Sequence, residues 1–182
     1  MTRTRPYPAG LAAIWSLSLL IAAISATSAT AQSRLEYSVK ANYLVRFAAF
    51  VDWPPRAFAT PASPVVLCVV GRDPFAGSLA AAVRGQTAHG RTMVVRRPAA
   101  TALAGCHIVY VGQGGGAALA AAAGQPGLLV VTDSAAAPER GAIHFVLSDG
   151  RVRFHIDQQA ASRNGLTISS RLLNLALSTR GG

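Results

Sequence analysis

The strongest pattern of hydrophobic and polar positions lies at residues 41–54, which read ANYLVRFAAFVDWP. At about 100° per residue, the aromatic and aliphatic side chains gather within an arc of roughly 160°. Asn42, Arg46 and Asp52 lie outside that arc, so the spacing predicts a helix with one buried and one wet face. Trp53 and Pro54 are predicted to end it, because a residue before proline avoids the helical conformation.

Continuous apolar runs, bounded by proline, glycine or polar residues, predict buried strands further along the chain. They lie at residues 64–71, 92–96, 106–111 and 127–132. Helical segments are expected between them. Asp73 and Pro74 are a typical helix opening, and that helix is predicted to reach Gly85. Residues 98–104 are predicted to form a short helical connection, and the alanine-rich residues 117–123 a further helix.

The C-terminal third begins with a predicted antiparallel hairpin. Residues 142–147 and 151–156 flank a tight turn at residues 148–150. The second arm alternates between a polar and an apolar face. Its polar positions are Arg151, Arg153 and His155, and its apolar positions are Val152, Phe154 and Ile156.

Two helices are expected after the hairpin. Asp157 is predicted to cap the first, which Gly165 ends, and residues 168–177 are predicted to form the second. The tail after Ser178 is expected to be loose. Buried strands that alternate with helices predict an α/β fold. We expect a single-domain sandwich with a mostly parallel central sheet, flanked by helices and finished by the C-terminal antiparallel hairpin plus helix.

The front of the chain has the features of a secretory signal peptide. Arg3 and Arg5 precede an apolar run, and residues 29–31 (ATA) supply the small side chains that signal peptidase requires. A membrane anchor is the alternative, but the apolar run is shorter than the ~20 residues of a full span. We expect cleavage after Ala31 and a periplasmic mature protein, with residues 1–31 as signal peptide and 32–182 as one domain.

The chain is basic, with a formal net charge of +10. Without Arg3 and Arg5, 15 Lys and Arg stand against 7 Asp and Glu, which leaves +8 for the mature protein. Export, the lack of a Lys/Arg run longer than two residues and the lack of a nucleic-acid motif all oppose a nucleic-acid partner. We interpret the charge as a property of an envelope protein surface.

Residues 112–117 (GQGGGA) fit the dinucleotide pattern G-x-G-x-x-A between a strand and a helix. A nucleotide site would need an acidic residue at the end of a second strand that leads into a helix. Asp133 ends a strand, but Pro138 and Gly141 follow where that helix should be. The segment is therefore predicted to be a turn, and no cofactor is expected.

Groups for catalysis or metal binding are sparse. The histidines show no metal-ligand spacing, the carboxylates are scattered singly, and no nucleophile elbow or Walker loop occurs. We therefore expect no catalytic site, no metal and no enzyme. Cys68 and Cys106 are the only cysteines. An oxidising compartment allows them to pair, and two unpaired buried thiols are the alternative.

Several ordered blocks resemble the YfiR family of periplasmic proteins. They are VKANYLVRFAAFVDWP, LCVVGRDPF, GRTMVVRR, CHIVYV and RVRFHIDQQAASRNGLTISSRLLNLA. The resemblance implies a repressor that binds the periplasmic sensor domain of an inner-membrane diguanylate cyclase, keeps cyclic di-GMP low and restrains biofilm formation. It also implies an α/β fold, a homodimer, an outer-membrane lipoprotein that sequesters the repressor, and a disulfide between Cys68 and Cys106.

Arg151, Arg153 and His155 are the candidate binding residues, because they share one exposed strand face that suits an acidic partner surface or an anion. A second class of function stays open on the same residues. A periplasmic small-molecule binding protein could use these three side chains to bind an anionic ligand.

Overall fold

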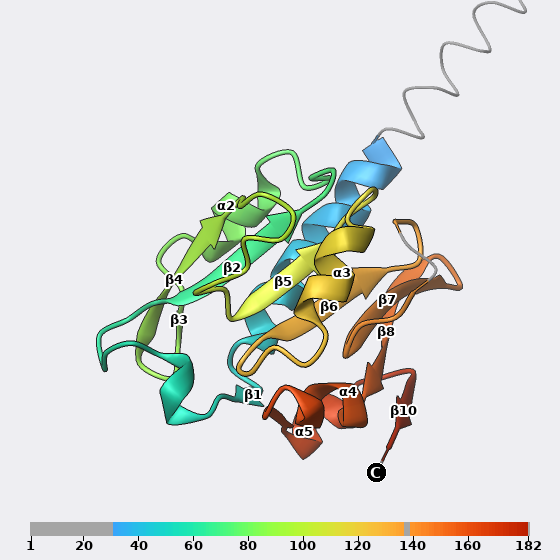
Figure 1. Ribbon diagram of the computed structural model, residues 1–182. Coiled ribbons are helices and arrows are strands. Elements are labelled where there is room, and N and C mark those ends of the chain that lie inside the picture. The colour runs from blue at the N-terminus through green and yellow to red at the C-terminus, as the bar shows by residue number, and fades with distance from the viewer. Residues whose placement is uncertain (1–30, 137–138, 182) are drawn as a thin grey trace, which may run out of the picture. The chain divides into compact units, whose positions relative to one another are not determined.

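The computed structural model describes residues 31–136 and 139–181. Met1–Glu36 and Tyr37–Gly182 are separate compact units, and the fold described below is that of the second (Figure 1). The predicted signal peptide therefore lies, except for Ala31, outside the described residues.

Within the described residues, eight strands form one sheet in the order β10-β8-β7-β6-β5-β2-β4-β3. The strands are β2 (Val65–Val70), β3 (Thr87–Ala88), β4 (Arg91–Arg96), β5 (Ile108–Val111), β6 (Leu129–Asp133), β7 (Ile143–Ser148), β8 (Arg151–Asp157) and β10 (Ser178–Arg180). The pairings from β4 through β7 are parallel, β7 and β8 form an antiparallel hairpin, and β10 runs parallel to β8. The predicted α/β fold with a mostly parallel sheet and a C-terminal hairpin is confirmed.

Helices cover both faces of the sheet centre. The helix of residues 37–47 and α2 (Ser78–Val83) pack on one face, together with α4 (Gln158–Arg163). The other face carries α3 (Gly116–Ala122), which lies in front of the sheet in Figure 1. All six residues of β2 are buried and alternate between these two layers. Burial on both faces explains why this strand is a continuous apolar run rather than an alternating one.

The first helix has the predicted faces but ends earlier than predicted. Its apolar side chains at Leu44 and Phe47 are buried, whereas Arg46 is exposed. The chain leaves the helix after Phe47 rather than at Trp53, and β1 (Val51–Asp52) pairs antiparallel with β9 (Thr167–Ile168). This distant pairing gives the backbone partners that a longer helix would have supplied, so tertiary contacts outweigh the local pattern.

The helix expected after β2 is present as α2 but begins later than predicted, and the helical connection expected at residues 98–104 does not form. Asp73 does not cap a helix: its Oδ1 accepts a hydrogen bond from the Phe75 N–H at 2.8 Å, and α2 begins only at Ser78. Its other oxygen lies 2.7 Å from Arg97. Residues 98–104 form turns rather than a helix. The short η1 helix (Pro55–Ala57) and the two-residue strand β3 were not predicted from the sequence.

The hairpin and the cap that follows it agree with the sequence. Asp149 and Gly150 both have positive φ angles, 51° and 69°, as a tight two-residue hairpin turn requires. Asp157 caps α4, because its Oδ1 accepts a hydrogen bond from the Ala160 N–H at 2.8 Å.

The last part of the chain differs from the prediction. The helix expected at residues 168–177 is only α5 (Ser170–Leu173), and Leu175 is 59% exposed rather than buried. The tail after Ser178 is not loose, since it forms β10 at the edge of the sheet. The Leu177 N–H donates to the Phe154 carbonyl at 2.8 Å and sets this strand in register with β8.

Candidate functional site

In the part of the chain that the structure describes, one half of the sheet has a face without a covering helix. The core cluster beneath α3 is built from β2, β5, β6 and nearby loops, and among the described residues it includes none from β7, β8 or β10. On that face β8 presents Arg151 and Arg153, both exposed, and His155, which is half-buried. We call these three residues the basic face. The structure places them on one side of one strand, as the alternation predicts.

The two arginines of the basic face are available for a partner. Within the described residues, neither Arg151 nor Arg153 makes a side-chain hydrogen bond or an ion pair. Alternate residues on a strand lie about 6.6–6.8 Å apart, so the basic face is a row of evenly spaced positive or titratable groups. Such a row can attract an acidic surface at long range.

His155 lines a small cavity at the end of β8, whereas Arg151 and Arg153 do not. The cavity has a volume of about 140 Å³ and is lined by Arg140, His144, His155, Asp157, Ser178 and Arg180, among others. His155 Nδ1 lies 2.6 Å from Ser178 Oγ of β10, and Arg180 of the same strand forms an ion pair with Asp157. We call this cavity the basic pocket.

The basic pocket carries an excess of positive charge, because two arginines face one carboxylate. Burial, and then the Arg140 charge, lower the pKa of His155. The same two causes lead for His144, whose pKa is also lowered. Burial opposes ionisation of Asp157, yet hydrogen bonds from Arg180 and Ala160 hold the pKa of this carboxyl below its usual value. The one carboxylate of the pocket is thus committed to Arg180.

Sequence reasoning found only one member of this pocket. Arg140 lies between the predicted strand at residues 127–132 and the predicted hairpin, and Arg180 lies in the tail expected to be loose. His144 lies on the first arm of the hairpin, and its Nδ1 lies 2.8 Å from Thr132 Oγ1. The usable signal was the pairing of the two hairpin arms, because it sets His144 directly opposite His155.

The glycine-rich segment at residues 112–116 forms the predicted turn, at the carboxyl ends of β2 and β5. Doubly wound sheets bind ligands at such points, where successive strands are added first to one side of the central strand and then to the other. Here the two loops contact each other directly, with the Arg72 N–H donating to the Gln113 carbonyl at 2.9 Å. A Cβ on Gly112 would lie 2.1 Å from the Arg72 carbonyl oxygen. Gly112 therefore serves the close approach of two loops.

A buried ion pair that the sequence did not predict lies near the same end of the sheet. Lys40 Nζ lies 2.7 Å from Asp133 Oδ2, and the two side chains are 1% and 0% exposed. Tyr110 OH donates to the same oxygen at 3.0 Å. Burial raises the pKa of Tyr110 far above its usual value, so its hydroxyl remains a donor. The network ties the first helix to β5 and β6.

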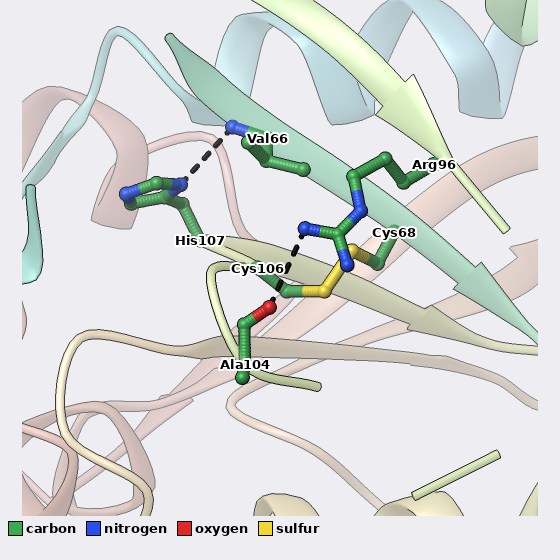
Figure 2. Close-up of a disulfide and its surroundings, with 6 residues drawn as sticks. All are labelled: Val66, Cys68, Arg96, Ala104, Cys106 and His107. Atoms are coloured by element: carbon green, nitrogen blue, oxygen red, sulfur yellow. Dashed lines mark hydrogen bonds between the residues drawn. A yellow bond between two sulfur atoms is a disulfide. The ribbon is translucent and has the colours of Figure 1, made fainter. Parts of the chain in front are cut away.

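Cys68 of β2 forms a disulfide with Cys106, which precedes β5 (Figure 2). The Cα atoms lie 5.9 Å apart, within the range of ordinary disulfides. Cys68 is fully buried and Cys106 is 7% exposed. Arg96 lies against the bond in Figure 2 and donates from Nη1 to the Ala104 carbonyl at 3.4 Å. The cysteines implied by the family resemblance are therefore bonded to each other, and both are buried.

His107, next to Cys106, connects the loop before β5 to β2 and to η1. Its Nδ1 accepts from the Val66 N–H at 3.1 Å, so Nε2 carries the proton and donates to the Ala57 carbonyl at 3.0 Å. Burial lowers the pKa of His107, which keeps the ring neutral in this role. Both ring nitrogens therefore serve hydrogen bonds within the fold.

The fold and its basic face define an α/β domain with a surface suited to a negatively charged partner. A family model described as YfiR/HmsC-like matches residues 37–177, and the chain therefore belongs to the YfiR/HmsC-like family. This family is regulatory rather than catalytic, and it is periplasmic. No curated protein matches the chain.

The described residues, 31–136 and 139–181, contain no group of three or more His, Cys, Asp or Glu side chains placed to hold a metal ion. In the same ranges, no helix combines the length and the apolar character needed to cross a membrane.

Proposed function

We propose that this protein represses an inner-membrane diguanylate cyclase by binding its periplasmic sensor domain, which lowers cyclic di-GMP and restrains biofilm formation. The match of residues 37–177 to the YfiR/HmsC-like family carries the proposal, because membership supports a periplasmic regulator of diguanylate cyclase signalling. Cleavage after Ala31 delivers the domain to the periplasm. A homodimer and release by an outer-membrane lipoprotein belong to the same proposal.

The basic face gives the proposal a contact surface. Arg151 and Arg153 are exposed and unpaired within the described residues, and no helix of the domain covers that part of the sheet. We place the sensor domain of the cyclase on this face, with acidic side chains opposite the arginines. Charge complementarity of this kind speeds encounter and fixes orientation more than it adds to affinity.

Deletion of the chain is expected to raise cyclic di-GMP and surface attachment, because the cyclase loses its repressor. The measurement is the nucleotide level in matched deletion and complemented strains. The same deletion in a strain without the cyclase is the control, and it should leave the level unchanged. A flat nucleotide level in the first strain counts against repression.

Replacing Arg153 with glutamate is expected to weaken capture of the cyclase from detergent-solubilised envelope. The loss should be larger at low salt than at high salt, because exposed charges are screened within about 8–10 Å near physiological ionic strength. Arg84→Glu is the matched control, since Arg84 ends α2 on the opposite face of the sheet. Equal capture by Arg153→Glu and the unchanged protein at both salt concentrations would remove the basic face from the interface.

The alternative function is a periplasmic protein that binds a small anion. The observation that favours it is the basic pocket, where His155 meets Arg140 and Arg180. Capture of a cyclase with no bound small molecule supports repression alone. Co-purification of a tightly bound anion without a protein partner supports the alternative.

A further inference from the structure

We propose that the basic pocket binds a phosphate group, held between Arg140 of the loop before β7 and Arg180 of β10. The site is separate from the arginines of the basic face, because Arg151 and Arg153 do not line the pocket. It also goes beyond repression of a cyclase, since it gives the domain a ligand of its own.

The charges around the pocket are unbalanced without an anion. Arg140 makes no ion pair or side-chain hydrogen bond among the described residues. Arg180 of β10 forms an ion pair with the single lining carboxylate, Asp157 of β8. Two guanidinium groups therefore face one carboxylate, beside two imidazoles whose lowered pKa values favour the neutral form. A bound dianion would satisfy the second arginine and favour protonation of the histidines.

The shape of the pocket suits a phosphate group. Its volume of about 140 Å³ corresponds to roughly five water molecules. That space admits a tetrahedral anion with a few waters. Guanidinium groups bind phosphate oxygens in pairs of parallel hydrogen bonds, and this geometry distinguishes them from lysine. All the cationic side chains of the pocket other than histidine are arginines.

The walls of the pocket are built and held in place by the fold. His144 is 4% exposed and lies 2.8 Å from Thr132 Oγ1, which in turn accepts a hydrogen bond from the Gly141 N–H at 2.8 Å. This chain of contacts fixes the backbone next to Arg140. On the other side, Ser178 Oγ lies 2.6 Å from His155 Nδ1 and fixes β10. A phosphate between Arg140 and Arg180 would therefore connect β10 to the centre of the sheet.

The test is a calorimetric titration of the full exported protein with inorganic phosphate, against sodium chloride at the same ionic strength. We expect saturable binding of phosphate, and an affinity about tenfold lower for Arg140→Gln, since a charge-assisted contact is lost. Arg84→Gln, at an exposed arginine outside both the pocket and the basic face, should bind phosphate normally. Equal heats with chloride, or unchanged affinity in Arg140→Gln, would overturn the site.

A second readout separates binding from folding, and a third identifies the source of the phosphate. In an NMR titration, phosphate should raise the pKa of His144 and His155, which face Arg140, Arg180 and Asp157. Unchanged pKa values of both histidines would contradict the site.

Glycerol phosphate and phosphatidylcholine vesicles with or without phosphatidylglycerol are then compared. If the protein binds glycerol phosphate and Arg140→Gln removes this binding, the pocket is a site for a soluble ligand. If it binds the phosphatidylglycerol vesicles and Arg140→Gln removes that binding, the pocket is a lipid headgroup site. Purified protein suffices throughout, so failure here leaves cyclase repression standing.

Discussion

Replacing Lys40 with methionine is expected to destabilise the domain by about 3–5 kcal/mol, because the change leaves a buried carboxylate without its cation. Asp133 is 0% exposed, and Lys40 Nζ lies 2.7 Å from it. The hydroxyl of Tyr110 and the N–H of Ala135 still donate to this carboxylate, but neither carries a positive charge. In a domain of this size the melting temperature should fall by roughly 10 °C.

Two further variants distinguish the ion pair from a general effect on the helix. Arg46→Met changes an exposed residue of the same helix and should alter the free energy of unfolding by less than about 0.5 kcal/mol. Asp133→Asn in the Lys40→Met background should recover part of the lost stability, because the buried group no longer carries a charge. A Lys40→Met protein that melts like the unchanged protein would show that the pair contributes nothing to stability.

The strands were predictable from sequence because a strand that is buried on both faces consists almost entirely of apolar residues. A central strand covered on both faces must be apolar throughout, and β2, with every residue buried, is the clearest case. The hairpin was equally accessible, since Asp149 and Gly150 accept the positive φ angles that its turn needs. In both cases the determining physics acts within a few residues along the chain.

The helix ends were not predictable for the opposite reason. The first helix ends before Val51 because Ile168, more than a hundred residues away, pairs with that residue. His89 also contacts the backbone where this helix ends, because its Nε2 lies 3.1 Å from the Ala48 carbonyl and 3.0 Å from the Val51 carbonyl. The local pattern carries no trace of such partners. For the same reason, the sequence treated the residues of β10 as a tail.

The candidate site also has one part that a local sequence pattern predicts and another that depends on contacts between distant segments. Alternation along β8 was enough to place Arg151 and Arg153 together on an exposed face. The basic pocket needs three separate segments, since Arg140, His155 and Arg180 meet only when β10 has joined the sheet. Lys40 and Asp133 meet across 93 positions of sequence, so neither residue alone indicated a buried pair.

Replacing Cys68 with serine is expected to cost about 2–4 kcal/mol, through loss of a cross-link that restricts the unfolded chain. The two cysteines are 38 positions apart, and for a loop of this length the chain-entropy relation gives roughly 4 kcal/mol. The serine hydroxyl would also be buried at a site with 0% exposure, which adds to the loss. The melting temperature should drop by several degrees or more, and the periplasmic abundance of the protein with it.

The matched variant is Cys68→Ala with Cys106→Ala, which removes the bond without a buried hydroxyl or a free thiol. It should be less destabilised than Cys68→Ser but still clearly weaker than the unchanged protein. Mild reductant should act slowly on the native protein, because Cys68 is fully buried and Cys106 is only 7% exposed. Two free thiols in the native, air-oxidised protein would refute the bond. Normal melting of the double variant with loss of repression would instead assign the bond a redox role, since a structural cross-link cannot be removed without a cost in stability.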